Sequence, residues 1–135
     1  MKRRDSRFVG TWEGLAFERV CLMHVDEIKK ALQIGGVVCE VSTWRSSGDE
    51  HVQIDMLISR NDGVVNLCEM KFSREPYELT SDELARMQRR RRVFKDETGT
   101  RKAVHLTLVV SPELKKNAYA NDIQSTVALD DLFRE

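Results

Sequence analysis

The sequence predicts an α/β fold in which helices flank a short mixed sheet, and three observations predict it. A segment with apolar residues at helical spacing comes first, three β-rich segments follow, and a second helical segment precedes another β-rich run. This order, α-β-β-β-α-β, is typical of a sheet sandwiched between helices. The chain has 135 residues, enough for a real hydrophobic core, so we expect one domain over residues 1–135 with its core at about 12–110.

The first helix is expected from Thr11 to about Gln33. Its apolar face recurs at helical spacing and comprises Phe17, Cys21, His24, Ile28 and Leu32, widened by Leu22 and Val25. Such spacing is typical of an amphipathic helix. Gly35 and Gly36 are expected to stop it.

Three β-rich segments follow, of which the first is expected from Val37 to Trp44. After a polar turn, the strands His51 to Arg60 and Val64 to Phe72 form a hairpin. The turn between them, Asn61-Asp62-Gly63, has the residues that hairpin loops prefer.

The second helix is expected from Ser81 to Glu97, because Asp82 and Glu83 suit its N-terminal end and Gly99 ends it. The remaining expected elements are a strand from Val104 to Val110, a turn around Lys115 to Asn121, a short strand from Thr126 to Leu129, and a final segment from Asp130 to Phe133.

Charged residues occupy positions of the hairpin where strands usually carry apolar side chains. If the three-residue loop pairs Arg60 with Val64, counting back along both strands places Asp55 opposite Glu69. Cross-strand neighbours have Cβ atoms about 5 Å apart, and Lys71 lies two residues after Glu69, on the same face. Turn chemistry therefore brings two carboxylates and an ammonium group together.

Two carboxylates this close repel each other unless a cation lies between them. A hard divalent ion such as Mg²⁺ prefers oxygen ligands and would meet that need. It could hold a phosphate oxygen and lower the pKa of a bound water, while Lys71 could orient or deprotonate that water. This arrangement suits a phosphodiesterase.

The alternative is a charge cluster on a solvated face, in which Lys71 bridges the two acids. Leu57, Val65 and Leu67 share that face, so it is largely apolar and we expect a helix to cover it. Unpaired charges are costly in such surroundings, which favours the metal site.

The hairpin residues, from Gln53-Ile54-Asp55 to Glu69-Met70-Lys71, resemble the motif of the PD-(D/E)XK nuclease superfamily. The segments TWEGLAFERVCLMH, QIDMLISRNDGVVNLCEMKFS and ETGTRKAVHLTLVV look more specifically like the C-terminal domain of bacterial and archaeal AAA-type ATP-binding proteins. The resemblance spans roughly Trp12 to Phe133 and implies a restriction-endonuclease-like core. Ile54 stands where the motif's name has proline.

By this resemblance Asp55 and Glu69 would be metal ligands, with the backbone carbonyl of Met70, and Lys71 would be the catalytic lysine. Glu18, in the helix motif GLAFE, would add an outer or second-metal carboxylate, or it is a solvent-facing residue paired with Arg19 or a neighbour. The implied cofactor is Mg²⁺ or Mn²⁺.

An arginine run lies on the second helix, within RMQRRRRVF. Basic clusters on a helix can neutralise phosphates, so Arg89, Arg90 and Arg92 are candidate DNA contacts, and Gln88 could position the substrate. A solvated helix face is the alternative. Arg91 falls inside the expected apolar stripe, so either its stem packs there or it contacts something outside this chain.

Two functions remain open: a Mg²⁺-dependent endonuclease acting on DNA, and a non-catalytic module that serves an AAA-type ATPase. Because the chain has no GxxxxGK[ST] segment, ATP binding is not expected of it. Lys+Arg and Asp+Glu both number 22, so a DNA partner must meet a local patch. The sequence has no long apolar run, and its three cysteines are scattered. We therefore expect a cytoplasmic protein that does not bind a membrane. The sequence is also compatible with a homodimer.

Overall fold

The structure is a computed structural model that describes the backbone of residues 6–128 and the side chains of residues 13–128. Within this range one sheet has the strand order β1-β2-β3-β4-β5. Its strands are β1 Cys39–Arg45, β2 Gln53–Arg60, β3 Val64–Phe72, β4 Ala103–Ser111 and β5 Ser125–Ala128. The helices are α1 Ser6–Met23, α2 Val25–Ala31, α3 Ser81–Thr98 and the 3₁₀ helix η1 Tyr119–Asp122. The predicted α-β-β-β-α-β order is confirmed, with β5 added at its end.

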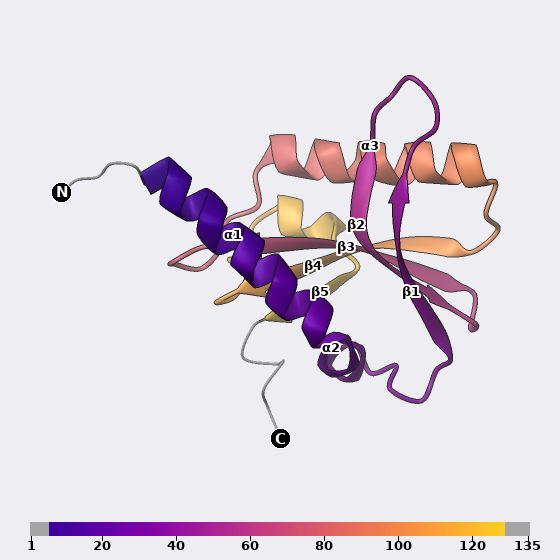
Figure 1. The fold of residues 1–135 in the computed structure, drawn as a ribbon, viewed down its shortest axis with the longest axis horizontal. Coiled ribbons are helices and arrows are strands. Elements are labelled where there is room, and N and C mark those ends of the chain that lie inside the picture. The colour runs from indigo at the N-terminus through magenta and orange to yellow at the C-terminus, as the bar shows by residue number, and fades with distance from the viewer. Residues whose placement is uncertain (1–5, 129–135) are drawn as a thin grey trace.

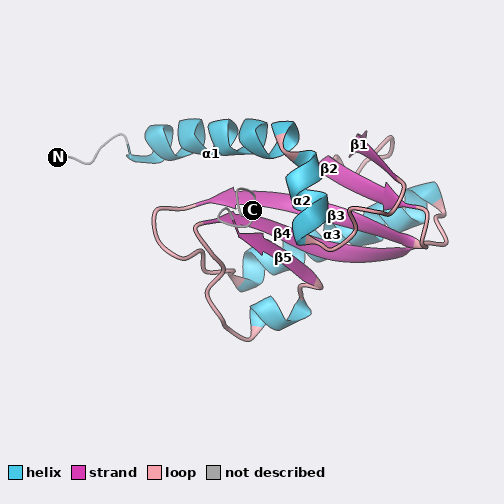
Figure 2. Cartoon of the chain, turned by 90° about the horizontal axis from the view of Figure 1, so that it is seen from below, coloured by secondary structure: helices cyan, strands magenta, loops and turns pink. Residues whose placement is uncertain are grey.

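The sheet is mixed and lies between layers of helices. β1, β2 and β3 are antiparallel neighbours, whereas β4 pairs parallel to β3 and β5 parallel to β4. α1 crosses in front of the sheet in Figure 1, and Figure 2 shows α1 and α2 on one side of it and α3 on the other. A parallel neighbour of β3 requires a crossover, which α3 supplies.

Each face of the sheet has its own apolar core. On one face Phe17, Cys21 and Ile28 of α1 and α2 pack against residues of β2 and β3 such as Met56 and Cys68. On the other face the α3 residues pack against the sheet, and this second cluster includes Leu57, Val65, Leu67, Leu84, Met87, Val93 and Phe94. The expectation that a helix covers the face of Leu57, Val65 and Leu67 is therefore confirmed.

The single helix expected from Thr11 to Gln33 is wrong, because the chain forms two helices that meet at His24. His24 has non-helical backbone angles, φ −125° and ψ 39°. Its Nδ1 lies 2.8 Å from the carbonyl oxygen of Val20. Figure 2 shows α2 turning from the end of α1 toward the sheet, where Ile28 is fully buried. After the break, Ile28 packs in the same cluster as Phe17 and Cys21 of α1.

Two further details of this region differ from the expectation. Leu22 does not widen the buried face and is 47% exposed. The helical segment also ends slightly earlier than Gln33, because α2 stops at Ala31 and Gln33 takes the left-handed conformation with φ 63°. The spacing of apolar residues predicted helix but could not show where it would bend.

The hairpin forms with the predicted register. Ser59 pairs with Val65 and Met56 pairs with Cys68, which is the register that pairing Arg60 with Val64 requires. Gly63 adopts φ 90° in the turn, a conformation that favours glycine. The pairing on which the predicted Asp55–Glu69 neighbourhood depends is confirmed.

The boundaries of α3 follow its capping residues. The Thr80 hydroxyl accepts a hydrogen bond from the backbone N–H of Glu83 at 3.1 Å, and Gly99 ends the helix in the left-handed conformation with φ 63°. The expected turn at 115–121 contains the start of η1, and the expected short strand is β5. The expectations for Leu129 and for Asp130 to Phe133 lie outside the described residues.

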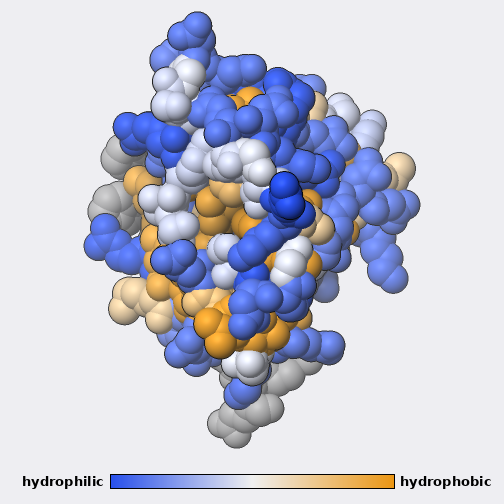
Figure 3. Space-filling model, turned by 90° about the vertical axis from the view of Figure 1, so that its right-hand side faces the viewer, coloured by the Kyte–Doolittle hydropathy of each residue, from blue (hydrophilic) through white to orange (hydrophobic). Residues whose placement is uncertain are grey.

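β1 is the most exposed strand of the described sheet and forms one of its edges. Val41 within it is 40% exposed. Figure 3 views the side where β1 lies in Figure 1, and apolar atoms there interrupt a largely polar surface. Trp44 instead turns inward and packs edge-on against Phe94, with ring centroids 5.3 Å apart.

Across the described helices, no stretch is long and apolar enough to cross a membrane.

Candidate active site

Asp55 lies at an irregularity of the sheet. Ser42 pairs with Leu57 and Trp44 pairs with Ile54, so Asp55 and Met56 together lie opposite the single residue Thr43. On the other side of β2 the ladder to β3 reaches only to Met56. Asp55 thus occupies a β-bulge in the β1–β2 ladder, next to the point where the β2–β3 ladder ends, and bulges often re-aim a side chain next to a functional site.

The bulge changes which residues of β2 share a face. Ile54 and Leu57 both pack in the cluster beneath α3, although strict alternation would put residues three apart on opposite faces. The plain alternation that we expected along β2 is therefore wrong at this point. On β3 the alternation holds, because Leu67 packs beneath α3 and both Glu69 and Lys71 pair with residues of that helix.

The carboxylates of Asp55, Glu69 and Glu18 are electrostatically coupled. Burial raises the pKa of Glu69, and the negative charges of Asp55 and Glu18 raise it further, while Arg90 and Lys71 lower it. Burial also raises the pKa of Glu18, and the next largest cause is the charge of Asp55. Side chains from β2, β3 and α1 thus act on one another through their negative charges.

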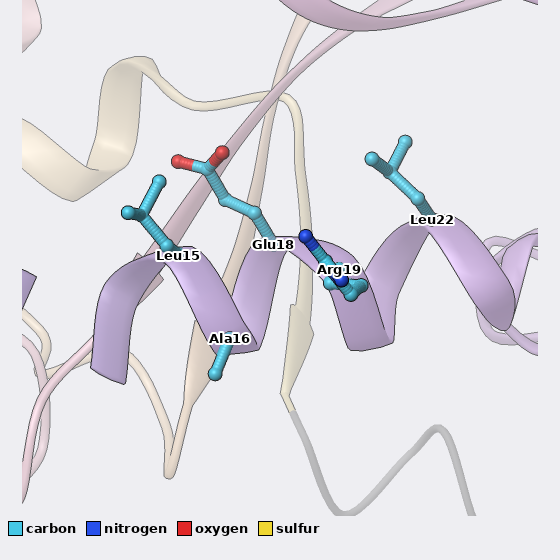
Figure 4. A pocket seen from close by; sticks show the side chains of 5 residues that line it. All are labelled: Leu15, Ala16, Glu18, Arg19 and Leu22. Carbon is cyan, nitrogen blue, oxygen red and sulfur yellow. The ribbon is translucent and has the colours of Figure 1, made fainter. Parts of the chain in front are cut away.

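Glu18 lies in a hollow of about 430 Å³ on α1. In Figure 4, Leu15, Glu18 and Leu22 project to the same side of the helix, whereas Ala16 points to the opposite side. Leu15 and Leu22 are both exposed, so the carboxylate stands between two apolar side chains. No ion pair links Glu18 to Arg19 among the described residues, and the alternative role that we considered for it lacks that contact.

Lys71 is held by an acidic residue of α3. Its Nζ lies 2.6 Å from Oε2 of Glu83, and the hydroxyl of Tyr77 donates to the same oxygen at 3.1 Å. Arg86 pairs with Oε1 of Glu83. Burial lowers the pKa of Lys71. The positive charges of Arg90 and Arg86 lower it further, whereas the negative charges of Glu69 and Glu18 raise it.

Glu69 is held by a basic residue of the same helix. Nη1 of Arg90 lies 3.1 Å from Oε2 of Glu69, and the two side chains are only 28% and 13% exposed. Arg90 was expected to contact nucleic acid as part of the arginine run, for which a solvated helix face was the alternative. In the structure its guanidinium pairs with Glu69 of β3 and does not lie on a solvated face. The apolar stripe of α3 turns Arg90 toward the sheet.

Asp55 is oriented from its own strand. The side-chain amide of Gln53 donates to Oδ1 of Asp55 at 3.0 Å, and Arg45 of β1 donates to Oε1 of Gln53 at 3.2 Å. Gln53 therefore links Asp55 to the edge strand.

The other arginines of the run are distributed around α3. Arg89 pairs with Glu50 in the β1–β2 loop at 2.9 Å, and Arg92 lies 3.5 Å from the same carboxylate. For Arg91, which is half-buried, the described residues supply no ion-pair partner. A hollow of about 320 Å³ lies beside it and is lined by Gln88, Arg91, Arg92, Lys95 and Asp96.

Asp55 and Glu69 are the carboxylates that would hold a metal ion, if that ion keeps most of its water. Among residues with described side chains, no group of three or more His, Cys, Asp or Glu residues is arranged to hold a metal. Mg²⁺, however, is commonly bound through one or two carboxylates and several waters. Asp55 and Glu69 supply two such carboxylates, and their mutual repulsion favours a cation between them.

Sequence reasoning missed the contribution of α3 to this site. It treated Glu83 only as an acid suited to a helix N-terminus, whereas Glu83 contacts Lys71 directly. The sequence does contain a signal for this contribution. Glu83 and Arg90 lie at helical spacing from the buried residues Met87 and Phe94, so all four share one face of α3. That face had to lie over the sheet, and Glu69 and Lys71 point toward it.

The fold is similar to two solved structures. One is a repair endonuclease from Pyrococcus abyssi, with a TM-score of 0.53 and 17% sequence identity over 95% of this chain and 48% of that chain. The other is AF1548, a protein of unknown function, with a TM-score of 0.51 and 15% identity over 77% of this chain and 54% of that chain. The chain thus spans about half the length of these proteins, and at such identities the similarity shows a nuclease-like fold.

No protein-family description matches the chain, and no curated protein matches it in sequence.

Proposed function

We propose that this chain is a nuclease domain that hydrolyses DNA phosphodiesters with the help of a divalent metal ion. The observation that carries the proposal is the neighbourhood of Asp55, Glu69 and Lys71 at a strand bulge, in a sheet of nuclease-like fold. One structural neighbour is a repair endonuclease, which agrees with this chemistry.

In this proposal Asp55 and Glu69, with the backbone carbonyl of Met70, hold Mg²⁺ or Mn²⁺. The bound ion would supply charge stabilisation at the phosphate and a water of lowered pKa. Gln53 orients Asp55, and Lys71, held by Glu83, contributes an ammonium group whose pKa burial lowers and the charge of Glu69 raises. Glu18 adds negative charge from α1, which favours cation binding.

The DNA backbone would lie along α3, where Gln88, Arg89 and Arg92 are candidate contacts. In the structure Arg89 and Arg92 both form ion pairs with Glu50. To bind these arginines, phosphates would have to replace the Glu50 carboxylate. Arg91 and Lys95 line the adjacent hollow, and the described residues give neither a carboxylate within ion-pair distance. Phosphates would supply the negative charge that Arg91 and Lys95 lack among the described residues.

The test is cleavage of plasmid and single-stranded DNA by the purified protein with Mg²⁺, Mn²⁺ or EDTA. Metal-dependent cleavage should be lost in Asp55→Asn and in Lys71→Met. Lys115→Met is the matched control, because Lys115 is an exposed lysine that also pairs with a glutamate, Glu78, and it should cleave like the wild type. Equal cleavage by wild type and Lys71→Met would refute the proposal.

The second candidate is a non-catalytic module that serves an AAA-type ATPase. It is favoured by the pairing of Glu69 with Arg90 and of Lys71 with Glu83, which leaves both charges compensated without a metal. Binding to an AAA-type ATPase module, measured by pull-down with ATP, ADP or no nucleotide, tests it. No association under all three conditions would eliminate this candidate.

A further inference from the structure

The ion pair between Arg90 and Glu69 differs from the other arginine pairs of α3. Both of its side chains are largely buried, at 28% and 13% exposure, whereas Arg89 and its partner Glu50 are 46% and 42% exposed. Exposed pairs contribute little and exchange readily with solvent. A buried pair is different, because removing one partner leaves an uncompensated charge.

The position of the guanidinium is as informative as its burial. Its Nη1 lies 3.1 Å from Oε2 of Glu69, which is one of the oxygens that the proposed metal would use. Two cations cannot share one carboxylate at this range without strong repulsion. Arg90 also lowers the pKa of Glu69 and of Lys71, so its charge acts on both sides of the site.

We propose that Arg90 is a built-in counter-ion for Glu69, which a divalent metal must displace from that carboxylate, and that it thereby sets the metal affinity of the site. The inference rests on the proposed function, because it assumes that Glu69 is a metal ligand. Without a metal Arg90 neutralises Glu69 and keeps the buried carboxylate compatible with folding. With a metal the guanidinium withdraws toward solvent along its flexible stem.

The first experiment is calorimetric titration of Mn²⁺ into metal-free protein, with all variants compared at the same pH. Arg90→Gln should bind Mn²⁺ roughly tenfold more tightly than the wild type, because a nearby positive charge has been removed. Arg90→Lys keeps a positive charge and should remain closer to the wild type.

A matched control is Arg60→Gln, which should leave the Mn²⁺ affinity unchanged. Arg60 is another partly buried arginine, but it ends β2 and pairs with Asp62 at the turn end of the β2–β3 hairpin. An affinity gain in this variant equal to that of Arg90→Gln would show a general effect of charge and would overturn the inference.

Thermal unfolding supplies a second readout. Without metal, Arg90→Gln should unfold at a lower temperature than the wild type, because Glu69 has lost its counter-ion. Saturating Mn²⁺ should raise the unfolding temperature of Arg90→Gln more than that of the wild type, since binding stabilises the folded state. Equal shifts in the two proteins would contradict the inference.

Asp55→Asn separates this inference from the proposed function. If the wild type binds Mn²⁺ in a manner that depends on Asp55, and Arg90→Gln binds no more tightly, the inference is wrong and the metal site stands. If neither protein binds Mn²⁺ through Asp55, the metal site and the inference both fail. Asp55-dependent binding that appears only in Arg90→Gln would support the inference directly.

Discussion

At the N-terminal end of α3, the single carboxylate of Glu83 interacts with Lys71, Tyr77 and Arg86. Each partner comes from a different part of the chain: β3, the segment after it, and the next turn of α3. Lys71 extends toward α3 because its charged partner lies there, and Glu83 therefore decides where the ammonium group is held. The position of the Lys71 ammonium group thus depends on Glu83, a side chain outside the hairpin motif that contains Asp55, Glu69 and Lys71.

Replacement of Glu83 by Gln should lower the free energy of unfolding by about 1–3 kcal/mol, because a partly buried carboxylate that serves charged partners is lost. DNA cleavage should fall as well, since Lys71 loses its fixed position. Denaturant unfolding and cleavage rates measure the two effects. Glu78→Gln is the control, because Glu78 pairs with Lys115 at the surface, and it should change neither quantity.

The pH dependence of stability should report the burial of Glu69. Its pKa in the folded protein is raised above the ordinary value of 4.5, so between the two values the folded state binds more protons than the unfolded state. The free energy of unfolding contributed by this group therefore falls as pH rises through that window and stays low above it.

The comparison is between wild type and Glu69→Gln in EDTA, by denaturant unfolding at a series of pH values from about 4.5 upward. The wild type should lose stability relative to the variant as pH increases, because only the wild type carries the titrating carboxyl. A constant difference across the series would contradict the raised pKa.

At the scale of elements, α3 is the structural support of the site because it carries Glu83, Arg86 and Arg90 over β3. Its register depends on how it begins. The Thr80 hydroxyl accepts from the N–H of Glu83, the same residue whose side chain holds Lys71. The N-cap and the lysine contact are therefore coupled through one residue.

Thr80→Ala should destabilise the protein by about 1 kcal/mol, which is typical of the loss of a helix N-cap. It should also lower the cleavage rate, because the first turn of α3 would hold Glu83 less firmly. Thr80→Ser retains the hydroxyl and should restore both stability and cleavage. A cleavage rate equal to the wild type in Thr80→Ala would show that the first turn keeps its geometry without the cap.

On the scale of the whole molecule, the formal net charge is zero, yet the charges are unevenly arranged. Acidic groups of α1, β2 and β3 converge at the candidate site, and basic groups extend along α3. A nucleic acid would therefore be drawn to one helix and not to the molecule as a whole. Binding should weaken with salt in proportion to the few phosphates that α3 contacts.

Arg91→Ala should weaken DNA binding at all sequences alike and should reduce the slope of log affinity against log salt by about 1, if Arg91 neutralises one phosphate. Binding is measured by fluorescence anisotropy at several salt concentrations, with EDTA present to prevent cleavage. Arg74→Ala is the control, because Arg74 is exposed and pairs with Glu13. An unchanged salt slope in Arg91→Ala would exclude a phosphate contact at this residue.

The sequence by itself determined the order of elements and the hairpin register that relates Asp55 to Glu69. Both depend on local chemistry: apolar periodicity separates helix from strand, and Asn61-Asp62-Gly63 selects a turn whose register carries along the whole hairpin. Gly99 likewise marks the end of α3, because capping is a matter of neighbouring residues.

The tertiary structure alone decided the bend at His24, the bulge at Asp55 and the partners of the charged groups. The bend follows from docking Ile28 onto the sheet, and the bulge from the mismatch between β1 and β2. Glu83 and Arg90 meet Lys71 and Glu69 only because α3 packs across β3. Contacts between distant segments depend on packing in three dimensions, and hydrophobic periodicity specifies only which face of each element is buried.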